Sequence, residues 1–440
     1  MGINIKISNR HIIFQSFSSI GPMLDFVALL PVMGIFAGIY LPEATIVAFL
    51  ISIVTLIPVI GFSSRIFSNQ GYVSYVSESL GKYMGRISGI IYISYSFLVL
   101  PNIIMFLASF LFFFFSLSMS YRILFDTLFA ALYMTFIFIP LSKGLSMTIK
   151  PIMVLGALEI GTIAVSCIIM FLNPGPSFPA VHQSFSIYGS SFWEAVMLGI
   201  LMFSGGGSGI FLSGELRKEN TSTPRALIYA YLVSGLALII ASFSILIFTG
   251  NLLPTYFNDP AILFTRLGNI SGNVLLIAII VLLIASGYNL TLSYGNALLQ
   301  MLTAFIPGET GMNPGRGILA ASLIFFAIPI LVVSRIFFSF LYSFLFIAEL
   351  VSMLYGLNHI LVGISSARNG GKMLFRISGI VSSCLLATAI GISVYTSDLS
   401  EAYLVAIFLF LAIGSIIMST NMAQEKIIKY YEKFSQIRKN

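Results

Sequence analysis

Three acidic residues, Asp25, Glu159 and Glu349, lie within long apolar stretches of the sequence. At the centre of a membrane-spanning helix a charged side chain costs about 2.5–3.5 kcal/mol, so an acid that stays there needs a chemical reason. A carboxyl group removed from water favours its protonated form, which suits it to take up and release a proton. These three residues are therefore candidates for holding a proton or a cation in an apolar environment.

Each acid also has a structural interpretation. Asp25 lies three residues after a Gly-Pro pair, where it could meet an ammonium group or a coupling cation, or instead cap a helix as a neutral acid. Glu159, in the middle of VLGALEIGTI, could couple a proton or form a hydrogen bond with a neighbouring serine. Glu349, with Tyr342 and Tyr355 around it, fits a gating role or a packing role equally well.

A polar group in the stretch 270–305 offers a second kind of ion chemistry. Ser286, Asn289 and Thr291 supply the oxygen ligands that hard cations prefer, so they could hold sodium together with backbone carbonyls near residue 20. The same residue types also join neighbouring membrane helices by hydrogen bonds. Sodium coupling is therefore the alternative to proton coupling.

Two segments interrupt the apolar stretches with small residues. Glycine and proline weaken the helical hydrogen-bond ladder, and unpaired backbone groups at membrane depth are tolerated only where they line a protein cavity. The segments are Ser18, Ser19, Ile20, Gly21 and Pro22, and then Ser204, Gly205, Gly206, Gly207, Ser208 and Gly209. The alternative is that the glycines only let two helices pack closely.

Broken helices would offer a binding site for a zwitterion. The N-terminus of the second half presents N–H groups to a carboxylate, and the C-terminus of the first half presents carbonyls to an ammonium group. The successive glycines 205–207 suggest room for a bulky apolar group. Phe203, directly before the second interruption, is the candidate to cover a bound molecule, with Tyr92 and Tyr95 as weaker candidates. Tyr92 and Tyr95 are also candidates for a gate.

Composition explains why these interruptions lie in a membrane. Of 440 residues only 8% are charged, 58% are hydrophobic, and the mean hydropathy is +1.02. Soluble proteins carry about 25% charged residues, so this chain cannot cover a water-facing surface and must face lipid. A soluble enzyme, a disulfide scaffold and a disordered chain are excluded.

Other functional classes lack their residues. Cys167 and Cys384 lie in apolar stretches and the three histidines are far apart in the sequence, so we expect no metal and no other cofactor. No phosphate-binding loop of a primary pump occurs, and no catalytic motif indicates an enzyme. The net charge of +7 is scattered over loops, which argues against a nucleic-acid partner. The expected partners are a small molecule and the lipid bilayer, and the oligomeric state stays open.

A helix needs about 20 apolar residues to cross the hydrocarbon core of a bilayer. The hydropathy pattern predicts an all-α integral membrane protein with twelve such spans. They are 12–38, 42–62, 86–116, 122–142, 149–172, 193–214, 225–250, 270–305, 317–334, 336–363, 373–396 and 402–420.

Basic residues give an independent orientation, because Lys and Arg in short loops stay cytoplasmic. With both termini inside, nineteen of the 22 Lys and Arg residues fall on the inner side, and only Arg122, Arg266 and Arg335 fall on the outer side. We therefore expect a multi-pass protein of the cell membrane. The first apolar stretch is longer than the core of a signal peptide and shows no cleavage site, so we expect the N-terminus to be retained. The tail 421–440 has apolar residues at helical spacing between lysines, typical of a helix on the inner membrane surface or of a partner-binding segment.

The interruptions fall in predicted spans one and six, which cross in opposite directions. Paired interruptions at equivalent places of two halves indicate an inverted repeat with a binding site at the membrane midplane. The sequence thus predicts a single membrane domain over 1–440, with a 5+5 repeat over 12–172 and 193–363, two further helices over 373–420 and the tail 421–440.

Several stretches resemble the amino acid-polyamine-organocation superfamily of transporters. FSNQGYVSYVSESLGKYMGRISGIIY (67–92) is similar to its first cytoplasmic loop, and GELRKENTSTPRA (214–226) to the segment after its sixth span. Departures are Gly207 in place of an acidic residue, Glu219 in place of a proline, and a span eight without the usual Ser-Arg-rich pattern. The matching residues are Gly71, Tyr72, Tyr75, Val76, Leu80, Gly81, Gly85, Gly89, Gly205, Glu215, Pro224, Arg225 and Ala226.

This resemblance implies secondary active transport of amino acids or related amines by alternating access, driven by a proton or sodium gradient or by exchange. Glu159 stands in a span where the superfamily often places a coupling residue. Glu215, with Arg217 and Lys218, is a candidate for an inner gate with the loop 63–86, or else a solvated charge run. A passive channel is the less favoured alternative. A channel would carry polar residues in one continuous stripe along its pathway, whereas the polar residues here gather at the two interruptions.

Overall fold

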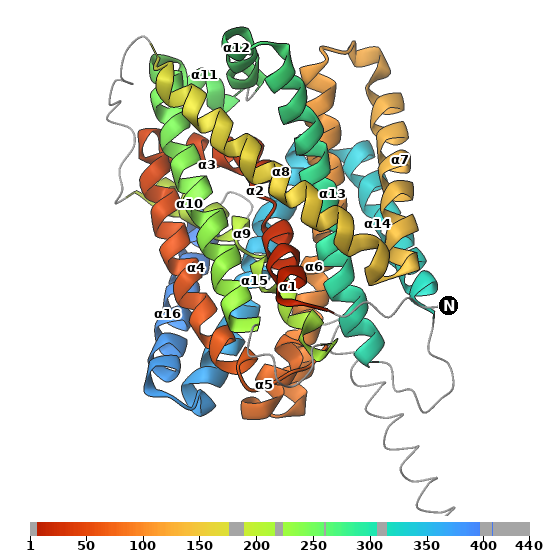
Figure 1. The fold of residues 1–440 in the computed structure, drawn as a ribbon, viewed down its shortest axis with the longest axis vertical. Helices are drawn as coiled ribbons and strands as arrows, with labels where there is room; N and C mark the ends of the chain where they lie inside the picture. Colours follow the sequence, from red (N-terminus) through yellow and green to blue (C-terminus); the bar gives the residue numbers. More distant parts are fainter. Residues whose placement is uncertain are drawn as a thin grey trace, which may run out of the picture.

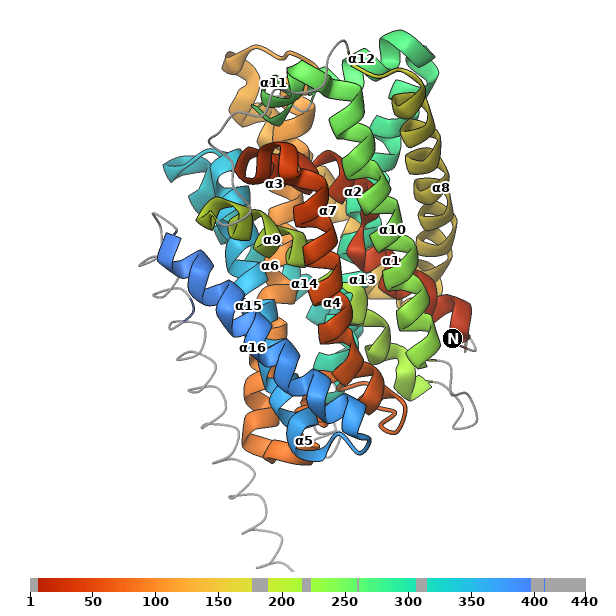
Figure 2. The same ribbon diagram turned by 90° about the vertical axis from the view of Figure 1, so that its left-hand side faces the viewer.

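The structure, a computed structural model, describes residues 7–175, 189–215, 223–258, 261–305 and 315–396, together with Ile407. Within these ranges the secondary structure is helical throughout and contains no strand. Most long helices run roughly along the long axis of the molecule, whereas α8 (Leu145–Leu172) crosses Figure 1 and α16 (Met373–Thr396) crosses Figure 2 obliquely, and shorter helices lie among them. The prediction of an all-helical membrane protein is confirmed at this level.

Nine long helices form most of the bundle. They are α4 (Leu41–Ser63), α6 (Lys82–Phe114), α7 (Arg122–Lys143), α8 (Leu145–Leu172), α10 (Thr223–Thr249), α13 (Asn273–Phe305), α14 (Arg316–Phe337), α15 (Phe340–Asn369) and α16 (Met373–Thr396). Each coincides with a predicted span to within a few residues, except that α15 extends to Asn369. Glycines in the left-handed region of the backbone mark two of the boundaries, with Gly81 (φ 87°) before α6 and Gly144 (φ 101°) between α7 and α8.

The described residues contain ten helical segments long and apolar enough to cross a membrane, where the sequence predicts twelve spans. The tenth segment is Ser190–Gly214, which is itself interrupted. The predicted first span, 12–38, is not among the ten because it is divided into α1 (Asn9–Ile20), α2 (Pro22–Val27) and α3 (Leu29–Ala37), and α3 continues through a 3-10 turn (Gly38–Tyr40) into α4. The predicted span 402–420 and the tail 421–440 lie outside the described residues, apart from Ile407.

Short helices fill the ends of the bundle and were not predicted. α5 (Tyr72–Leu80) packs against α6 and α15 at one end, and α11 (Leu253–Asn258) and α12 (Ala261–Ser271) lie at the other (Figure 1). Two 3-10 turns, Met119–Tyr121 and Gly250–Leu252, precede α7 and α11. These elements are too short to give a hydropathy signal in the sequence. Helices of this length are stabilised by packing onto neighbouring helices.

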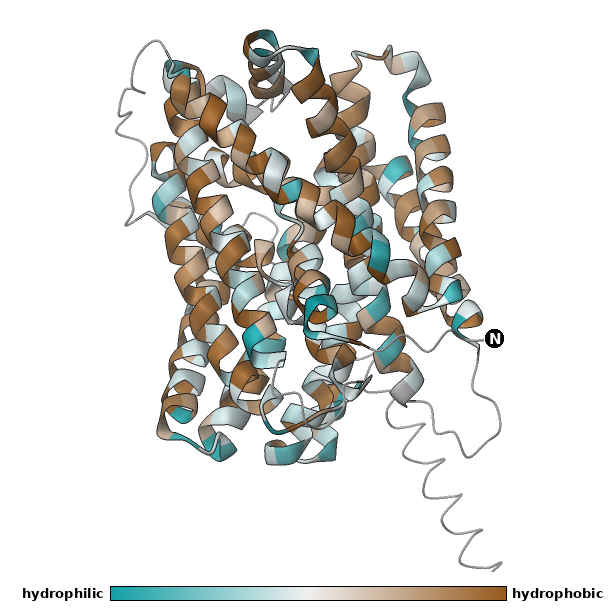
Figure 3. Cartoon of the chain, in the orientation of Figure 1, coloured by the Kyte–Doolittle hydropathy of each residue, from teal (hydrophilic) through white to brown (hydrophobic). Residues whose placement is uncertain are grey.

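The outer helices present apolar side chains to the surroundings. Leu132 and Phe136 on α7 and Phe325 on α14 are all more than half exposed. In Figure 3 the long helices are accordingly coloured mostly as hydrophobic. A surface of this kind is stable against lipid tails and not against water, which agrees with the low charge of the sequence.

Candidate functional site

The first interruption separates α1 from α2 at Gly21. This glycine has φ 67°, a left-handed conformation that costs a residue with a side chain much more, and Pro22 follows as the first residue of α2. The second interruption lies at 203–205, between α9 (Ser190–Met202) and the 3-10 helix η3 (Gly206–Glu215). Both predicted interruptions are therefore present in the structure.

The two interrupted helices contact each other directly. The Ser19 and Ser208 hydroxyls share a hydrogen bond, and the Ser208 hydroxyl also donates to the carbonyl of Gln15 (3.2 Å). One residue further along, the backbone N–H of Gly209 donates to the Ser16 hydroxyl (3.2 Å). All of these groups are buried, so hydrogen bonds between side chains and backbone hold α1 and η3 together away from water.

The glycines of the second interruption are packed tightly. A side-chain carbon added to Gly205 would lie 2.5 Å from the carbonyl carbon of Ser19, and one added to Gly206 would overlap the Tyr231 ring. One added to Gly207 would overlap the Tyr72 hydroxyl. The expectation that these glycines leave room for a bulky group is wrong in this conformation, and close backbone approach is what they provide.

Phe203 has a packing position. Its ring is fully buried and lies 5.6 Å from that of Phe49 and 6.0 Å from that of Tyr231, measured between centroids. The Tyr231 hydroxyl donates to the Phe203 carbonyl (3.1 Å), which satisfies one backbone group freed by the interruption. Phe203 does not line the cavity beside Asp25, so the structure does not place it where it would cover a molecule bound there.

Glu159 joins three elements. Its carboxyl accepts hydrogen bonds from the Ser286 hydroxyl (2.7 Å) and the Asn289 side-chain amide (3.2 Å), both on α13. The Ser286 oxygen in turn accepts from the backbone N–H of Leu24 (3.2 Å), in the first turn of α2. The side chain of Glu159 is fully buried on α8. One carboxyl therefore links α8, α13 and the start of α2.

The three residues considered for a sodium site are not together. Ser286 and Asn289 are bound to Glu159, whereas the Thr291 hydroxyl donates to the carbonyl of Gly287 (2.9 Å) and lies 3.4 Å from the Tyr133 hydroxyl. Thr291 thus belongs to a separate contact between α13 and α7.

Asp25 lies on the wall of a cavity of about 50 Å³ between the two interruptions. The side chain is 2% exposed, and its Oδ2 atom has no hydrogen-bond partner among the described residues. The Oδ1 atom of Asn102 on α6 is likewise unpartnered within the described chain. The polar residues that line the cavity are Ser19, Asp25, Asn102, Ser204 and Tyr294.

At about 50 Å³ the cavity has room for only a few water molecules. Binding sites for small organic molecules are larger and measure about 300–1,000 Å³. The hydroxyls of Ser204 and Tyr294 are 2.8 Å apart and close one side of it. A molecule as large as an amino acid has no room in it, so the cavity is closed in this conformation.

An aromatic cluster closes the bundle on the side of α5. Its buried members are Tyr72, Tyr92, Tyr95, Phe211, Tyr355 and His359. The closest ring pairs are Tyr92 with Phe211 (4.3 Å between centroids), Tyr355 with His359 (4.2 Å) and Tyr92 with Tyr95 (5.0 Å). The cluster brings α5, α6, α15 and η3 together, and it contains the gating candidates Tyr92 and Tyr95.

The remaining gating candidates are less defined. Glu215 is the last residue of η3, and its side chain lies outside the described residues, as do Arg217 and Lys218. Glu349 is half-buried on α15. Of the two tyrosines near it in sequence, Tyr355 belongs to the aromatic cluster and Tyr342 is exposed.

Sequence reasoning missed several residues of this centre. Asn102 and Tyr294 carried no signal, because a single polar residue in an apolar helix shows its partner only in three dimensions. Tyr72 was identified as part of a motif but received no role. His359 was read as one of three isolated histidines, although Tyr355 lies four residues before it on the same helical face.

Replacing Ser286 with alanine is expected to lower the free energy of unfolding by about 1–3 kcal/mol, because the N–H of Leu24 loses its buried partner. Thermal unfolding in detergent measures the change. Ser322→Ala is the matched control, since Ser322 is only half-buried on α14 and its hydroxyl donates within its own helix, to the carbonyl of Ile318. Equal unfolding temperatures for the two variants would contradict the link between Leu24 and Ser286.

No family model matches the chain, and no curated protein matches it. Among the described residues no group of three or more His, Cys, Asp or Glu side chains could hold a metal ion.

Proposed function

We propose that the chain is a secondary active transporter that carries amino acids or related amines across the cell membrane by alternating access. The observation that supports this most directly is the contact between two interrupted helices, with two buried carboxyls, those of Asp25 and Glu159, close to the first interruption. The ten apolar helices and the motif resemblance of 67–92 and 214–226 agree with it. Twelve spans in a 5+5 inverted repeat, with both termini cytoplasmic, are part of the proposal.

Asp25 is the group proposed to bind the substrate ammonium. The carboxylate is buried, one of its oxygens has no partner in the described chain, and it borders a cavity that residues of both interruptions line. An ammonium group satisfies a buried carboxylate by a charge-assisted hydrogen bond. The small volume of the cavity requires that the transported molecule enters in another conformation.

Glu159 is the group proposed to carry the coupling proton. As a carboxylate it accepts from Ser286 and Asn289, and as a neutral acid it must donate one hydrogen bond, so protonation changes its contacts with α13. Because Ser286 also receives the N–H of Leu24, the change reaches α2, which carries Asp25. Proton uptake and amine binding are thereby linked through a helix of six residues.

The aromatic cluster is the proposed inner gate. In the closed conformation Tyr72 lies against Gly207, so α5 blocks the path from the central cavity to that end of the bundle. Opening requires α5 to separate from η3 while the interrupted helices stay in contact.

A thermal-shift screen of the purified protein against the common amino acids and simple amines tests the substrate class, because a ligand bound only by the folded state raises the unfolding temperature. We expect at least one primary amine to do so, and its N-acetylated form to have no effect. Counterflow of that compound in liposomes, with sodium or with choline outside, then separates proton from sodium coupling. The absence of any shift and of any counterflow would overturn the proposal.

Asp25→Asn is expected to weaken binding of the same amine on the order of tenfold or more, because a hydrogen bond to a charged group contributes about 1.5–3 kcal/mol. The substitution keeps the shape of the side chain. The concentration dependence of the thermal shift measures the affinity, and an unchanged affinity would exclude Asp25 from the binding site.

A further inference from the structure

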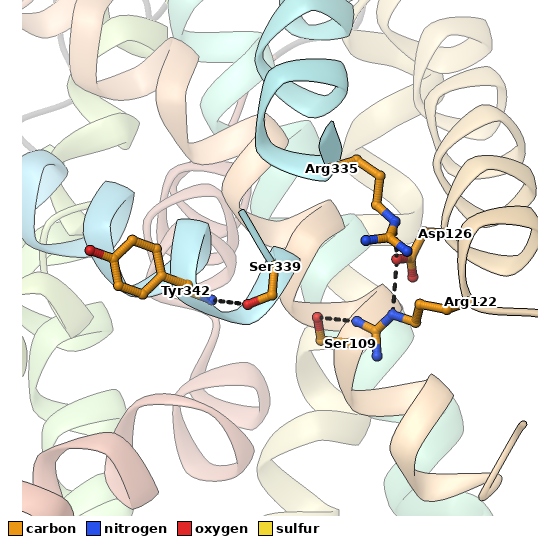
Figure 4. Close-up of polar contacts among 6 residues, drawn as sticks. All are labelled: Ser109, Arg122, Asp126, Arg335, Ser339 and Tyr342. Atoms are coloured by element: carbon orange, nitrogen blue, oxygen red, sulfur yellow. Dashed lines mark hydrogen bonds and ion pairs between the residues drawn. The ribbon is translucent and has the colours of Figure 1, made fainter. Parts of the chain in front are cut away.

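Two of the three basic residues expected on the outer side of the membrane converge on one acid. Arg122 and Asp126 lie in the first turns of α7, and Arg335 lies in the last turn of α14 (Figure 4). The Asp126 Oδ2 atom accepts from Arg122 Nε (2.9 Å) and lies 3.2 Å from Arg335 Nε. The cluster therefore holds two guanidinium groups and one carboxylate, an excess of one positive charge.

The excess charge belongs to Arg335. Arg122 is buried, donates to the Ser109 hydroxyl (3.0 Å) and lies over the rings of Phe112 (4.3 Å) and Phe113 (5.0 Å). Arg335 has only the ion pair with Asp126 among the described residues, and its side chain is 25% exposed. Its terminal N–H groups are thus available to an outside acceptor.

A pocket of about 360 Å³ between α7 and α14 begins at this cluster. Beyond Asp126, Thr127 and Arg335 its lining is apolar and includes Ala130, Met134, Leu331 and Val332. The stretch from Asp126 to Met134 covers about 12 Å along α7 at 1.5 Å per residue. The pocket opens on the lipid-facing surface, since its lining residues Ile123 and Ile336 are 66% and 69% exposed.

We propose that this pocket binds an anionic phospholipid, with the phosphate at Arg335 and one acyl chain along the groove between α7 and α14. A phosphate matches the planar donor pair of a guanidinium and neutralises the excess charge. The cluster lies about one turn inside the ends of both helices, the depth of the boundary between headgroups and acyl chains. A free phosphate would leave the apolar part of the pocket unfilled.

The position suits a structural lipid. The segments that contain α7 and α14 are the two least buried of the ten apolar segments. Their mutual packing leaves the pocket open, so a lipid that fills it adds contact area between them. The inference is independent of the proposed transport activity, because none of its residues belongs to the central cavity.

The test uses the full-length protein, delipidated in a non-ionic detergent, and follows its thermal unfolding with added phosphatidylglycerol, phosphatidylcholine or inorganic phosphate. We expect phosphatidylglycerol to raise the unfolding temperature and the other two to leave it unchanged. Arg335→Gln is expected to lower the affinity for phosphatidylglycerol on the order of tenfold, because a charge-assisted hydrogen bond is lost. The concentration dependence of the thermal shift measures this affinity.

Arg266→Gln is the matched control. Arg266 is the third basic residue expected on the outer side, but it donates to the Phe248 carbonyl (2.7 Å) and lies over the Phe248 ring, away from this pocket. Its variant should keep the full response to phosphatidylglycerol. An undiminished response in Arg335→Gln would overturn the proposal, as would an equal effect of phosphatidylcholine or of inorganic phosphate.

A second variant distinguishes lipid binding from a structural role of the cluster. Asp126→Asn removes the negative charge that competes with a phosphate, so it should bind phosphatidylglycerol more tightly than the wild type even though its lipid-free form unfolds at a lower temperature. If the cluster had only a structural role, Asp126→Asn would lower the stability of the protein without raising its affinity for phosphatidylglycerol. A weaker lipid response in Asp126→Asn therefore contradicts the proposed site.

Discussion

Glu159→Gln is expected to abolish accumulation of substrate driven by a pH gradient, while counterflow of substrate between the two sides of the membrane persists. The glutamine keeps the shape of the side chain and can still accept from Ser286, so α8 and α13 stay joined. It cannot bind and release a proton at physiological pH. Substrate exchange needs only the binding site and the conformational change. The substitution leaves the residues of the proposed binding site in place.

The size of the effect follows from the driving force. One pH unit supplies about 1.36 kcal/mol per proton, which is a tenfold accumulation when one proton moves with one neutral substrate. In proteoliposomes with such a gradient the concentration ratio should fall from about ten toward one in Glu159→Gln. Counterflow of labelled substrate, measured without a gradient, should continue.

Glu43→Gln provides the matched control, because Glu43 is an exposed acid in the first turn of α4. It should accumulate substrate as the wild type does. If Glu159→Gln accumulates substrate to the wild-type level under a pH gradient alone, Glu159 is not the coupling site. Loss of counterflow as well as accumulation would instead assign it a role in the conformational change.

Gly205→Ala is expected to have the largest effect on stability of any glycine-to-alanine change among the described residues. The added carbon would lie 2.5 Å from the Ser19 carbonyl carbon, and it would press on backbone that has no flexible side chain to move aside. Either α1 and η3 separate, which breaks the hydrogen bond between Ser19 and Ser208, or the strain stays. Overpacking of this kind costs about 1–3 kcal/mol and occasionally more.

Gly161→Ala is the comparison that isolates this effect. Gly161 lies within α8, two residues after Glu159, and an added carbon there meets no atom within 4 Å. Alanine in a helix interior is more favourable than glycine by roughly 0.5–1 kcal/mol, so this variant should unfold at the same or a higher temperature than the wild type. Thermal unfolding of both variants in detergent measures the difference. A Gly205→Ala protein as stable as Gly161→Ala would contradict the close contact.

Most long helices follow from the sequence because hydrocarbon thickness fixes their length. α6 and α13, for example, match the predicted stretches to within a few residues. The interruptions were also predictable, since Gly21-Pro22 and the glycines after Ser204 leave no apolar side chains to place. The first span shows the limit, because α2 and α3 are divided at Ala28, within the apolar run Phe-Val-Ala-Leu-Leu, which has no hydropathy signal for a break.

The site was predictable as a set of residue types and not as a set of contacts. The sequence left open whether Glu159 couples a proton or bonds to a serine, and the structure contains the serine bond, from Ser286, without deciding the coupling. The glycines were given the wrong purpose because a sequence does not reveal whether Tyr72 or empty space faces them. The partners of Arg122 and Arg335 could not be predicted, since pairing across α7 and α14 depends on their packing.

The bond between Leu24 and Ser286 has a consequence for how the chain is made. The two residues are 262 positions apart. At a synthesis rate of 5–20 residues per second, Ser286 is therefore added on the order of tens of seconds after Leu24, and until then the N–H of Leu24 lacks this acceptor. During that interval the N-terminal helices enter the membrane with an unmet hydrogen-bond donor, which is costly in hydrocarbon. We therefore expect the first helices to reach their final place only after α13 has been inserted, so that the earliest part of the chain to be synthesised is among the last to settle.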